Sequence, residues 1–122
     1  MYKIINVASV TTTIDGGVYR NKKPLNSELR DIVILPLSNY NGDEIINDAT
    51  FMVNCFCKNF VNGMPDISNL RAITNAVVAA IEAYNSSSHY YIFDITNQML
   101  LQDVDQKSMS YVNLRINCSI EK

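Results

Sequence analysis

The chain has 122 residues, of which 48% are hydrophobic and 18% charged, and its formal net charge is −2. This length suits one domain with a two-layer core, so we expect a single domain over residues 1–122. The charge balance argues against nucleic-acid binding through a basic excess, and no apolar run approaches the ~20 residues of a membrane span.

The N-terminal quarter contains the least regular pattern of the chain. Residues 2–13 carry several β-branched side chains but follow neither the period of a strand nor that of a helix. Their composition favours a strand, with a short helix as the alternative. After an Asp-Gly-Gly turn, residues 18–20 read as a short strand. The Lys22-Lys23 pair in the polar loop that follows is typical of a solvated tip, because no glycine-rich anion cradle accompanies it.

A second strand is predicted over residues 31–37, where consecutive apolar residues indicate burial until Pro36 removes a hydrogen-bond donor. The following segment, residues 38–48, is long for a simple hairpin connection. It is either a flexible link between two paired strands or a hairpin tip that contacts a neighbour. Its acids Asp43, Glu44 and Asp48 lack the spacing of a calcium loop, so we expect no metal here.

Residues 50–84 form the best-defined stretch of the sequence. Residues 50–58 are apolar on both faces, which predicts a central strand covered on two sides. A Gly/Pro turn follows, where Asp66 or Ser68 can cap the start of a helix. Apolar residues then recur at three- and four-residue steps from Leu70 to Tyr84. We expect an amphipathic helix packed on the sheet.

The C-terminal third is predicted to be mainly strand. After a polar connector over residues 85–88, aromatic residues favour a strand over 90–95, and a polar turn at 96–98 leads to a short strand at 99–101. Residues 112–120 alternate cleanly between apolar and polar. The whole pattern predicts an α+β fold: an antiparallel or mixed sheet of five to six strands with one main amphipathic helix packed on one face.

The residues that usually carry chemistry are sparse. Three cysteines, an odd number, favour reduced thiols over a disulfide framework. Cys55 and Cys57 lie two apart within an apolar strand, which is not the turn that a zinc site needs, even with Cys118 and His89 added. We predict small buried hydrophobic residues and no bound metal.

Catalytic arrangements are equally hard to find. His89, the single histidine, has no orienting acid suggested by the sequence. Asp103 and Asp105 lie in an apparent turn without an apolar pocket to raise a pKa. No nucleotide-binding or redox motif is present. We therefore predict that the protein is not an enzyme and needs no cofactor.

Two further properties concern location and partners. The first residues lack the charged region, long apolar region and cleavage site of a signal peptide, so we expect the chain to stay in the cytosol where it is made. The low share of charged residues is typical of a chain that buries surface against other chains.

A succession of short segments resembles a known family. The segments are Gly17-Val18-Tyr19-Arg20, Pro24-Leu25-Asn26-Ser27, Asp31-Ile32-Val33-Ile34, Val53-Asn54-Cys55-Phe56 and Asn62-Gly63-Met64-Pro65-Asp66, followed by the amphipathic helix. In this order they resemble the tail terminators of tailed bacteriophages, also called tail-to-head joining or tail completion proteins. The resemblance spans about Gly17 to Ile120, and none of its segments is a catalytic signature. Relatives begin with a clear helix, from which residues 1–13 depart.

This resemblance implies a structural virion protein without catalytic activity. Its copies would form a ring, commonly a hexamer, at the head-proximal end of the tail tube, assembled in the cytoplasm of the host bacterium. The implied partners are further copies of the chain, the tail tube protein and the head connector or adaptor protein, with no direct nucleic-acid readout and no membrane.

Two alternatives remain open at this point. Another neck component, such as a head-completion or connector adaptor ring, would have the same general properties. A small cytosolic ligand-binding domain, with Tyr90, Tyr91 and Phe93 lining a pocket, belongs to a different class. Ligand-dependent thermal stabilisation would favour the second alternative, whereas concentration-dependent assembly would favour a ring.

A closed ring needs two different complementary patches on each subunit. The best candidates are exposed segments of opposite charge on different connections. The predicted basic patch comprises Arg20, Lys22 and Lys23, and the predicted acidic patch comprises Tyr40, Asp43 and Glu44. Complementary charge of this kind sets the register between subunits more than it adds affinity.

Overall fold

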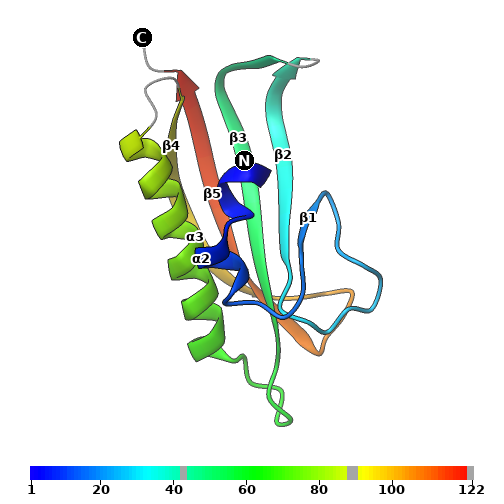
Figure 1. The fold of residues 1–122 in the computed structure, drawn as a ribbon. Coiled ribbons are helices and arrows are strands. Elements are labelled where there is room, and N and C mark those ends of the chain that lie inside the picture. Colours follow the sequence, from blue (N-terminus) through cyan, green and yellow to red (C-terminus); the bar gives the residue numbers. More distant parts are fainter. Residues whose placement is uncertain (42–43, 88–90, 121–122) are drawn as a thin grey trace.

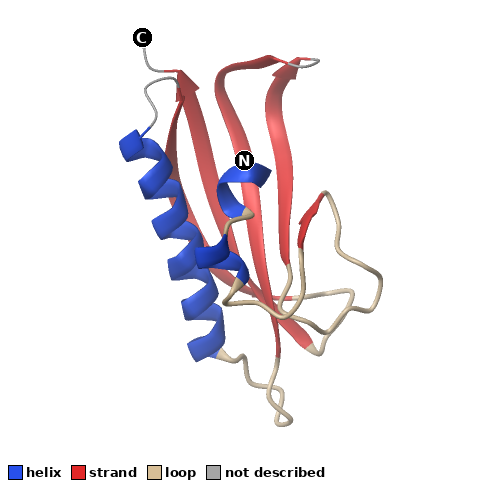
Figure 2. Ribbon diagram, viewed as in Figure 1, coloured by secondary structure: helices blue, strands red, loops and turns tan. Residues whose placement is uncertain are grey.

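The structure, a computed structural model, describes residues 1–41, 44–87 and 91–120, and the side chains among these other than those of residues 37–41, 44–49, 91 and 120. Its elements follow the order α1 (Tyr2–Ile5), α2 (Ala8–Thr11), β1 (Val18–Arg20), β2 (Ile32–Asn41), β3 (Glu44–Lys58), α3 (Ile67–Ser87), β4 (Tyr91–Gln102) and β5 (Met109–Ile120). The strands form one mixed sheet, and the long helix α3 packs against it (Figures 1 and 2). The predicted α+β class is confirmed.

The sheet has the strand order β1-β2-β3-β5-β4. β1 runs parallel to β2, and the other neighbouring pairs are antiparallel. β3 therefore lies in the centre, as its two apolar faces predict. The outer strands are the three-residue β1 and the twelve-residue β4.

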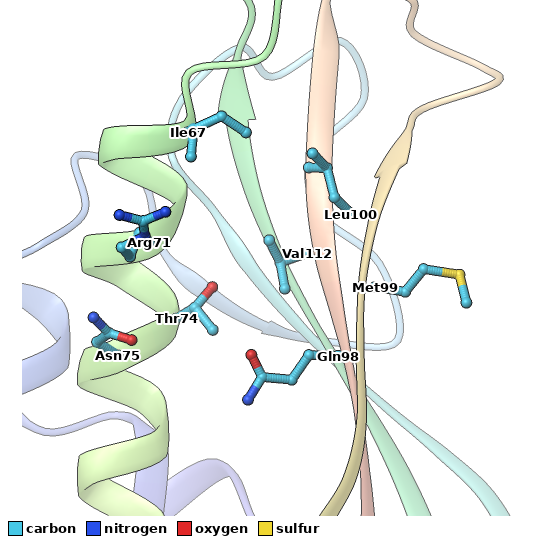
Figure 3. Close-up of a pocket in the computed structure, with 8 residues that line it drawn as sticks. All are labelled: Ile67, Arg71, Thr74, Asn75, Gln98, Met99, Leu100 and Val112. Carbon is cyan, nitrogen blue, oxygen red and sulfur yellow. The ribbon is translucent and has the colours of Figure 1, made fainter.

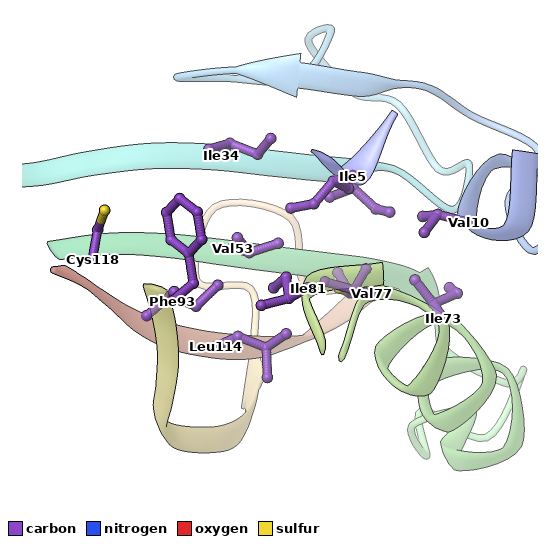
Figure 4. Close-up of a cluster of buried hydrophobic side chains, with 13 residues drawn as sticks. Ile5, Val10, Ile34, Val53, Ile73, Val77, Ile81, Phe93, Leu114 and Cys118 are labelled. Carbon is purple, nitrogen blue, oxygen red and sulfur yellow. The ribbon is translucent and has the colours of Figure 1, made fainter. Parts of the chain in front are cut away.

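The main core lies between the sheet and the helices (Figure 4). It is built from the inward residues of every layer: Ile5, Val10, Ile32, Ile34, Val53, Cys55, Ile73, Val77, Ile81, Phe93, Leu114, Ile116 and Cys118. The residues of α3 in this cluster recur at four-residue steps, so one stripe of the helix faces the sheet. Of the residues of the last strand predicted to point inward, Leu114, Ile116 and Cys118 are in this core and Val112 packs against it, while the Ile120 side chain lies outside the described residues.

The N-terminal segment is helical, so the preference for a strand over residues 2–13 is wrong and the alternative of a short helix holds. α1 and α2 each have only four residues. Ile5 and Val10 are fully buried in the main core, and both short helices pack against α3. Tertiary burial of these two side chains overrides the intrinsic preference of a β-branched sequence.

The connection between β2 and β3 is a long hairpin rather than a flexible link. Tyr40 pairs with Ile45 and Asn41 with Glu44, so pairing continues almost to the tip. The register shifts twice, between Pro36 and Ser38 and again before Tyr40. The hairpin alternative is therefore confirmed in its backbone.

β4 is one continuous strand, and the turn predicted at residues 96–98 is wrong. Ile95 pairs with Ile116 and Asn97 with Arg115, so Thr96 is an extra residue opposite β5. A β-bulge accommodates this residue without ending the strand. The polar run that suggested a turn lies on an exposed outer strand, where polar side chains are common.

α3 begins and ends through side-chain hydrogen bonds. The Asp66 carboxylate accepts from the Asn69 backbone N–H at 3.2 Å, so Asp66, not Ser68, caps the helix. At the other end, the Asn85 side chain bonds both the N–H and the C=O of Phe93, at 3.0 and 2.8 Å. This contact holds residues 85–87 in the helix, where a polar connector was predicted.

Candidate interaction surfaces

The predicted basic patch is split in the structure. The Arg20 guanidinium lies 4.5 Å from the centre of the Tyr2 ring, at the end of β1. Lys22 is exposed. Lys23 is half-buried, and its Nζ donates to Ser27 O at 2.8 Å. Lys22 is therefore available to a partner, whereas Arg20 and Lys23 each have a contact within the chain.

Lys23 connects its loop to the turn between β4 and β5. Besides Ser27, its Nζ donates to Gln106 Oε1 at 3.1 Å and lies 5.1 Å from the centre of the Phe56 ring. Phe56 in turn contacts Tyr111, with ring centres 4.9 Å apart. A second small core of Val33, Phe56 and Met109 lies beneath, on the sheet face opposite the helices. The loop thus covers the second face of β3 at this point.

The base of the same loop is fixed by Asp31. Its carboxylate is fully buried and accepts from the Gly17 N–H at 3.0 Å and from the Ser27 hydroxyl at 2.6 Å. A Cβ on Gly16 would lie 1.9 Å from Asp31 Oδ1, so only glycine fits there. This anchor was missed in the sequence, where Asp31 appeared only as the start of a strand.

The predicted acidic patch belongs to the tip of the β2–β3 hairpin. The backbones of Tyr40 and Glu44 take part in the pairing there, while their side chains and the whole of Asp43 lie outside the described residues. Arg20 pairs in register with Ile34, and the last paired residue of β2, Asn41, lies about 23 Å farther along the strand. The backbones of Arg20 and Asn41 are therefore well separated along β2.

Within the described residues, long segments of the outer strands have no neighbouring strand on one side. β1 pairs only with residues 32–34 of β2, so within the described residues no strand lies beside the rest of β2 on that side. β4 forms the other edge over twelve residues. At Phe93 this edge meets the Asn85 side chain from α3. Exposed strand edges invite pairing with another chain unless they are covered.

The sheet face away from α3 carries a row of polar side chains. Asn113 Nδ2 donates to Asn54 Oδ1 at 2.6 Å, and Thr50 Oγ1 donates to Asn117 Oδ1 at 3.1 Å. Asn113 was expected to point outward into solvent, yet only 8% of it is exposed. Its bond to Asn54 explains this, because a buried amide needs a partner. Arg115 remains exposed between the two pairs.

Two grooves border α3. The first has a volume of about 320 Å³ and lies between the first half of α3 and the strands β4 and β5. Figure 3 shows Thr74 and Gln98 reaching into it from opposite sides, with Arg71 and Asn75 on the helix nearby. The second groove, about 390 Å³, lies between the N-terminal segment and the second half of α3, and its lining is mainly apolar.

No group of three or more His, Cys, Asp or Glu side chains within the described residues can hold a metal, and His89 lies outside them. The three cysteines are buried free thiols. Burial raises the pKa of Cys55 to about 12, and the adjacent Thr74 hydroxyl opposes this only in part. A thiol that stays protonated is neither a nucleophile nor a metal ligand.

The other residues considered for catalysis or binding have structural contacts. Asp103 Oδ1 accepts from the Asp105 backbone N–H at 3.1 Å, so this acidic pair shapes a turn. Phe93 is 5% exposed and packs in the main core against Tyr84 and Phe51. It therefore does not line a pocket, and the other two residues of that hypothesis, Tyr90 and the Tyr91 side chain, lie outside the described residues.

The geometry defines an α+β protein with one helix-covered sheet face, two partly open edges and, among the described residues, no cluster of His, Cys, Asp and Glu side chains that could hold a metal. None of the helices in this part of the chain is long and apolar enough to cross a membrane. No protein-family model matches the sequence, and no curated protein matches it.

One similar solved structure is a chain from the "Virion of native gene transfer agent (GTA) particle". The two chains superimpose with a TM-score of 0.65 over 99% of this chain and 91% of the other, at 14% sequence identity. At this identity the likeness shows a shared fold over nearly the whole of both chains.

Proposed function

We propose that this chain is a structural virion protein of a tailed phage, and that its copies form a hexameric ring that terminates the tail tube and joins the tail to the head. The observation that carries this proposal is the match, from end to end, with a chain of a virion particle. Fold alone does not define function, so the remaining support comes from the surfaces.

The surfaces suit a ring because they are unlike one another. The predicted basic and acidic patches lie on different connections, and Arg20 is about 23 Å along β2 from Asn41, the last described residue before the two acids, which favours contact between copies. The two sheet edges are also different, one short and one long. Contacts between unlike patches repeat from copy to copy and close into a ring when the rotation allows.

The implied partners are further copies, the tail tube protein and the head connector, and the implied location is the neck of the virion after assembly in the host cytoplasm. Another neck component, either a head-completion or a connector adaptor ring, would use the same kinds of surface. These functions differ only in which partner each face of the ring contacts.

Electron microscopy of negatively stained samples tests the proposal. The purified chain is examined alone and after mixing with tubes assembled from the tail tube protein of the same phage. We expect rings with a central opening, and one such ring on a single end of each tube. Rings that form but do not bind the tubes would favour a connector adaptor on the head side. Binding along the tube wall, or no rings in either sample, would contradict the proposal.

A further inference from the structure

The loop between β3 and α3 carries three large apolar side chains into solvent. Phe60 is 54% exposed, Met64 60%, and Val61 fully. We call these three residues the apolar knob. The loop extends beyond the adjoining ends of β3 and α3 (Figure 1). Such side chains remain in water only at a cost, and on a protruding loop they typically mark an interaction site.

The apolar knob is held in shape by its own backbone. The Phe60 N–H donates to Met64 O at 2.9 Å, and the Gly63 N–H donates to Phe60 O at 2.8 Å. Gly63 has a φ of +84°, which glycine adopts without strain, and a further bond joins the Met64 N–H to Asn62 Oδ1 at 3.1 Å. A preorganised loop loses little conformational freedom when it docks.

A groove that suits these side chains lies toward the other end of α3. It has a volume of about 390 Å³, and its lining includes Ile4, Val7, Ala80, Ala83 and Tyr84. We call it the α3 groove. The small side chains of the two alanines leave space between the N-terminal segment and the helix. The lining also includes the polar residues Lys3, Ser9 and Ser87, all of them exposed. Apolar side chains placed between the apolar lining residues would leave water while these polar groups keep their access to solvent.

The apolar knob and the α3 groove of one copy cannot meet. The knob's loop ends at Ile67, and Ala83 lies about 24 Å farther along the helix axis. A knob that enters this groove must therefore come from another copy. A second copy carries a knob of matching character, and a contact between two unlike surfaces of the same chain is the heterologous kind that a ring requires.

The exposed area also fits a second copy. The chain exposes 7276 Å². A compact monomer of 13.8 kDa exposes about 6,600 Å², so this chain exposes roughly 650 Å² more. Each partner in a standard protein interface buries about 800 Å². This excess belongs to the whole chain, and it is of the same order as one partner's share of a standard interface.

We propose that the apolar knob of one copy inserts into the α3 groove of the next copy and that this contact links the subunits. The inference rests on the proposed ring and names the surfaces that would form it. The alternative groove beside the knob, lined by Arg71, Asn75 and Gln98 among others, is more polar and fits apolar side chains less well.

Site-specific crosslinking tests this contact. Val61→Cys and Ala83→Cys are made as separate variants of the full chain; both positions are exposed, and the native thiols are buried. The two variants are mixed at concentrations where the native chain assembles and treated with a short bismaleimide. We expect a covalent heterodimer at least ten-fold more abundant than any product of either variant alone. Val104→Cys, on a turn between β4 and β5, replaces Val61→Cys in the control mixture and should give none.

The possible outcomes separate the contact from the ring. A product from Val61→Cys alone, or preferential crosslinking of Val61→Cys to Asn75→Cys, would place the knob elsewhere and overturn the contact. Assembly without the heterodimer would overturn the contact and leave the ring standing. A native chain that never assembles would overturn the ring and the contact together. Independently, Val61→Asp should raise the concentration for half-assembly at least ten-fold while the variant stays folded, and unchanged assembly would contradict the proposal.

Discussion

The Asp31 carboxylate holds the conformation of the segment between Gly17 and Ser27, which carries Lys22. It is fully buried, and its two hydrogen bonds, to Gly17 and Ser27, hold both ends of the segment that presents Lys22. Loss of this carboxylate would be costly because it would leave buried hydrogen-bond donors without an acceptor. The position of Lys22 at the surface therefore follows from interactions some distance away along the chain.

Gly16→Ala should destabilise the fold by about 1–3 kcal/mol, the usual range for overpacking. The added Cβ would meet the Asp31 carboxylate at 1.9 Å and the Arg30 carbonyl oxygen at 2.8 Å, and the latter is backbone that cannot swing away. Urea unfolding followed by circular dichroism measures the change. Val104→Ala, at an exposed position, should leave stability nearly unchanged. Equal stability of the two variants would show that the loop moves freely.

Cys55 makes stability depend on alkaline pH. Burial raises its pKa from 9.0 to about 12, so above pH 9 the unfolded chain loses a proton that the folded chain keeps. The stabilising contribution is complete below pH 9 and is lost as pH rises toward 12, at roughly 1.4 kcal/mol per unit. Cys55→Ala should remove that share of the slope between pH 9.5 and 11. Parallel pH profiles for the two proteins would refute the assignment, since all other titrating groups are common to both.

At the scale of elements, the periodicity of apolar residues predicted the strands and the helix that form the core. The helix from Leu70 to Tyr84 and the alternating last strand each bury one regular stripe, and the central strand over residues 50–58 is apolar on both faces; these patterns are visible in the sequence. The short N-terminal helices and the bulge at Thr96 were not predictable, because tertiary contacts decide both. For the same reason, the sequence left two interpretations for residues 38–48, a flexible link and a hairpin.

The surfaces were less accessible to sequence reasoning than the fold. Charge marked Arg20, Lys22 and Lys23, but a lysine that contacts Gln106 and Phe56 cannot be told from a free one without the fold. The apolar knob was missed because its turn was read only as the start of a helix. Three large apolar residues around Asn62-Gly63 were the available signal, since a turn normally carries polar side chains.

Asp66→Ala should lower stability by about 0.5–2 kcal/mol, because the Asp66 carboxylate caps α3. Ser68→Ala is the matched comparison: the sequence offered both residues as caps, and the structure places Ser68 within the first turn, exposed. Thermal unfolding of the two variants provides the measurement. A larger loss for Ser68→Ala than for Asp66→Ala would contradict the observed start of the helix.

At the scale of the whole molecule, the proposed ring combines two kinds of contact. Apolar insertion of the knob would supply affinity, and the charged patches would set register and association rate. The charged contribution is screened by salt, because the Debye length is only about 10 Å at 0.1 M ionic strength. Assembly should therefore weaken with salt without disappearing.

Charge reversal tests the patches. Lys22→Glu and Glu44→Lys should each weaken assembly about ten-fold, and the double variant should recover most of the loss if the two patches meet. Lys22 is the right member of its patch to change because it is exposed, whereas Lys23 holds the loop. Arg71→Glu, an exposed position on α3, changes the net charge equally and serves as the control. Sedimentation velocity reports assembly, and additive losses in the double variant would argue against direct pairing.

Native mass spectrometry of the purified chain, over a wide concentration range at low and moderate salt, tests the ring most directly. The proposal predicts one dominant closed species, a hexamer, which grows with concentration and is weakened by salt. A compact dimer that persists at every concentration, or a strict monomer throughout, would contradict a protein whose copies close into a ring.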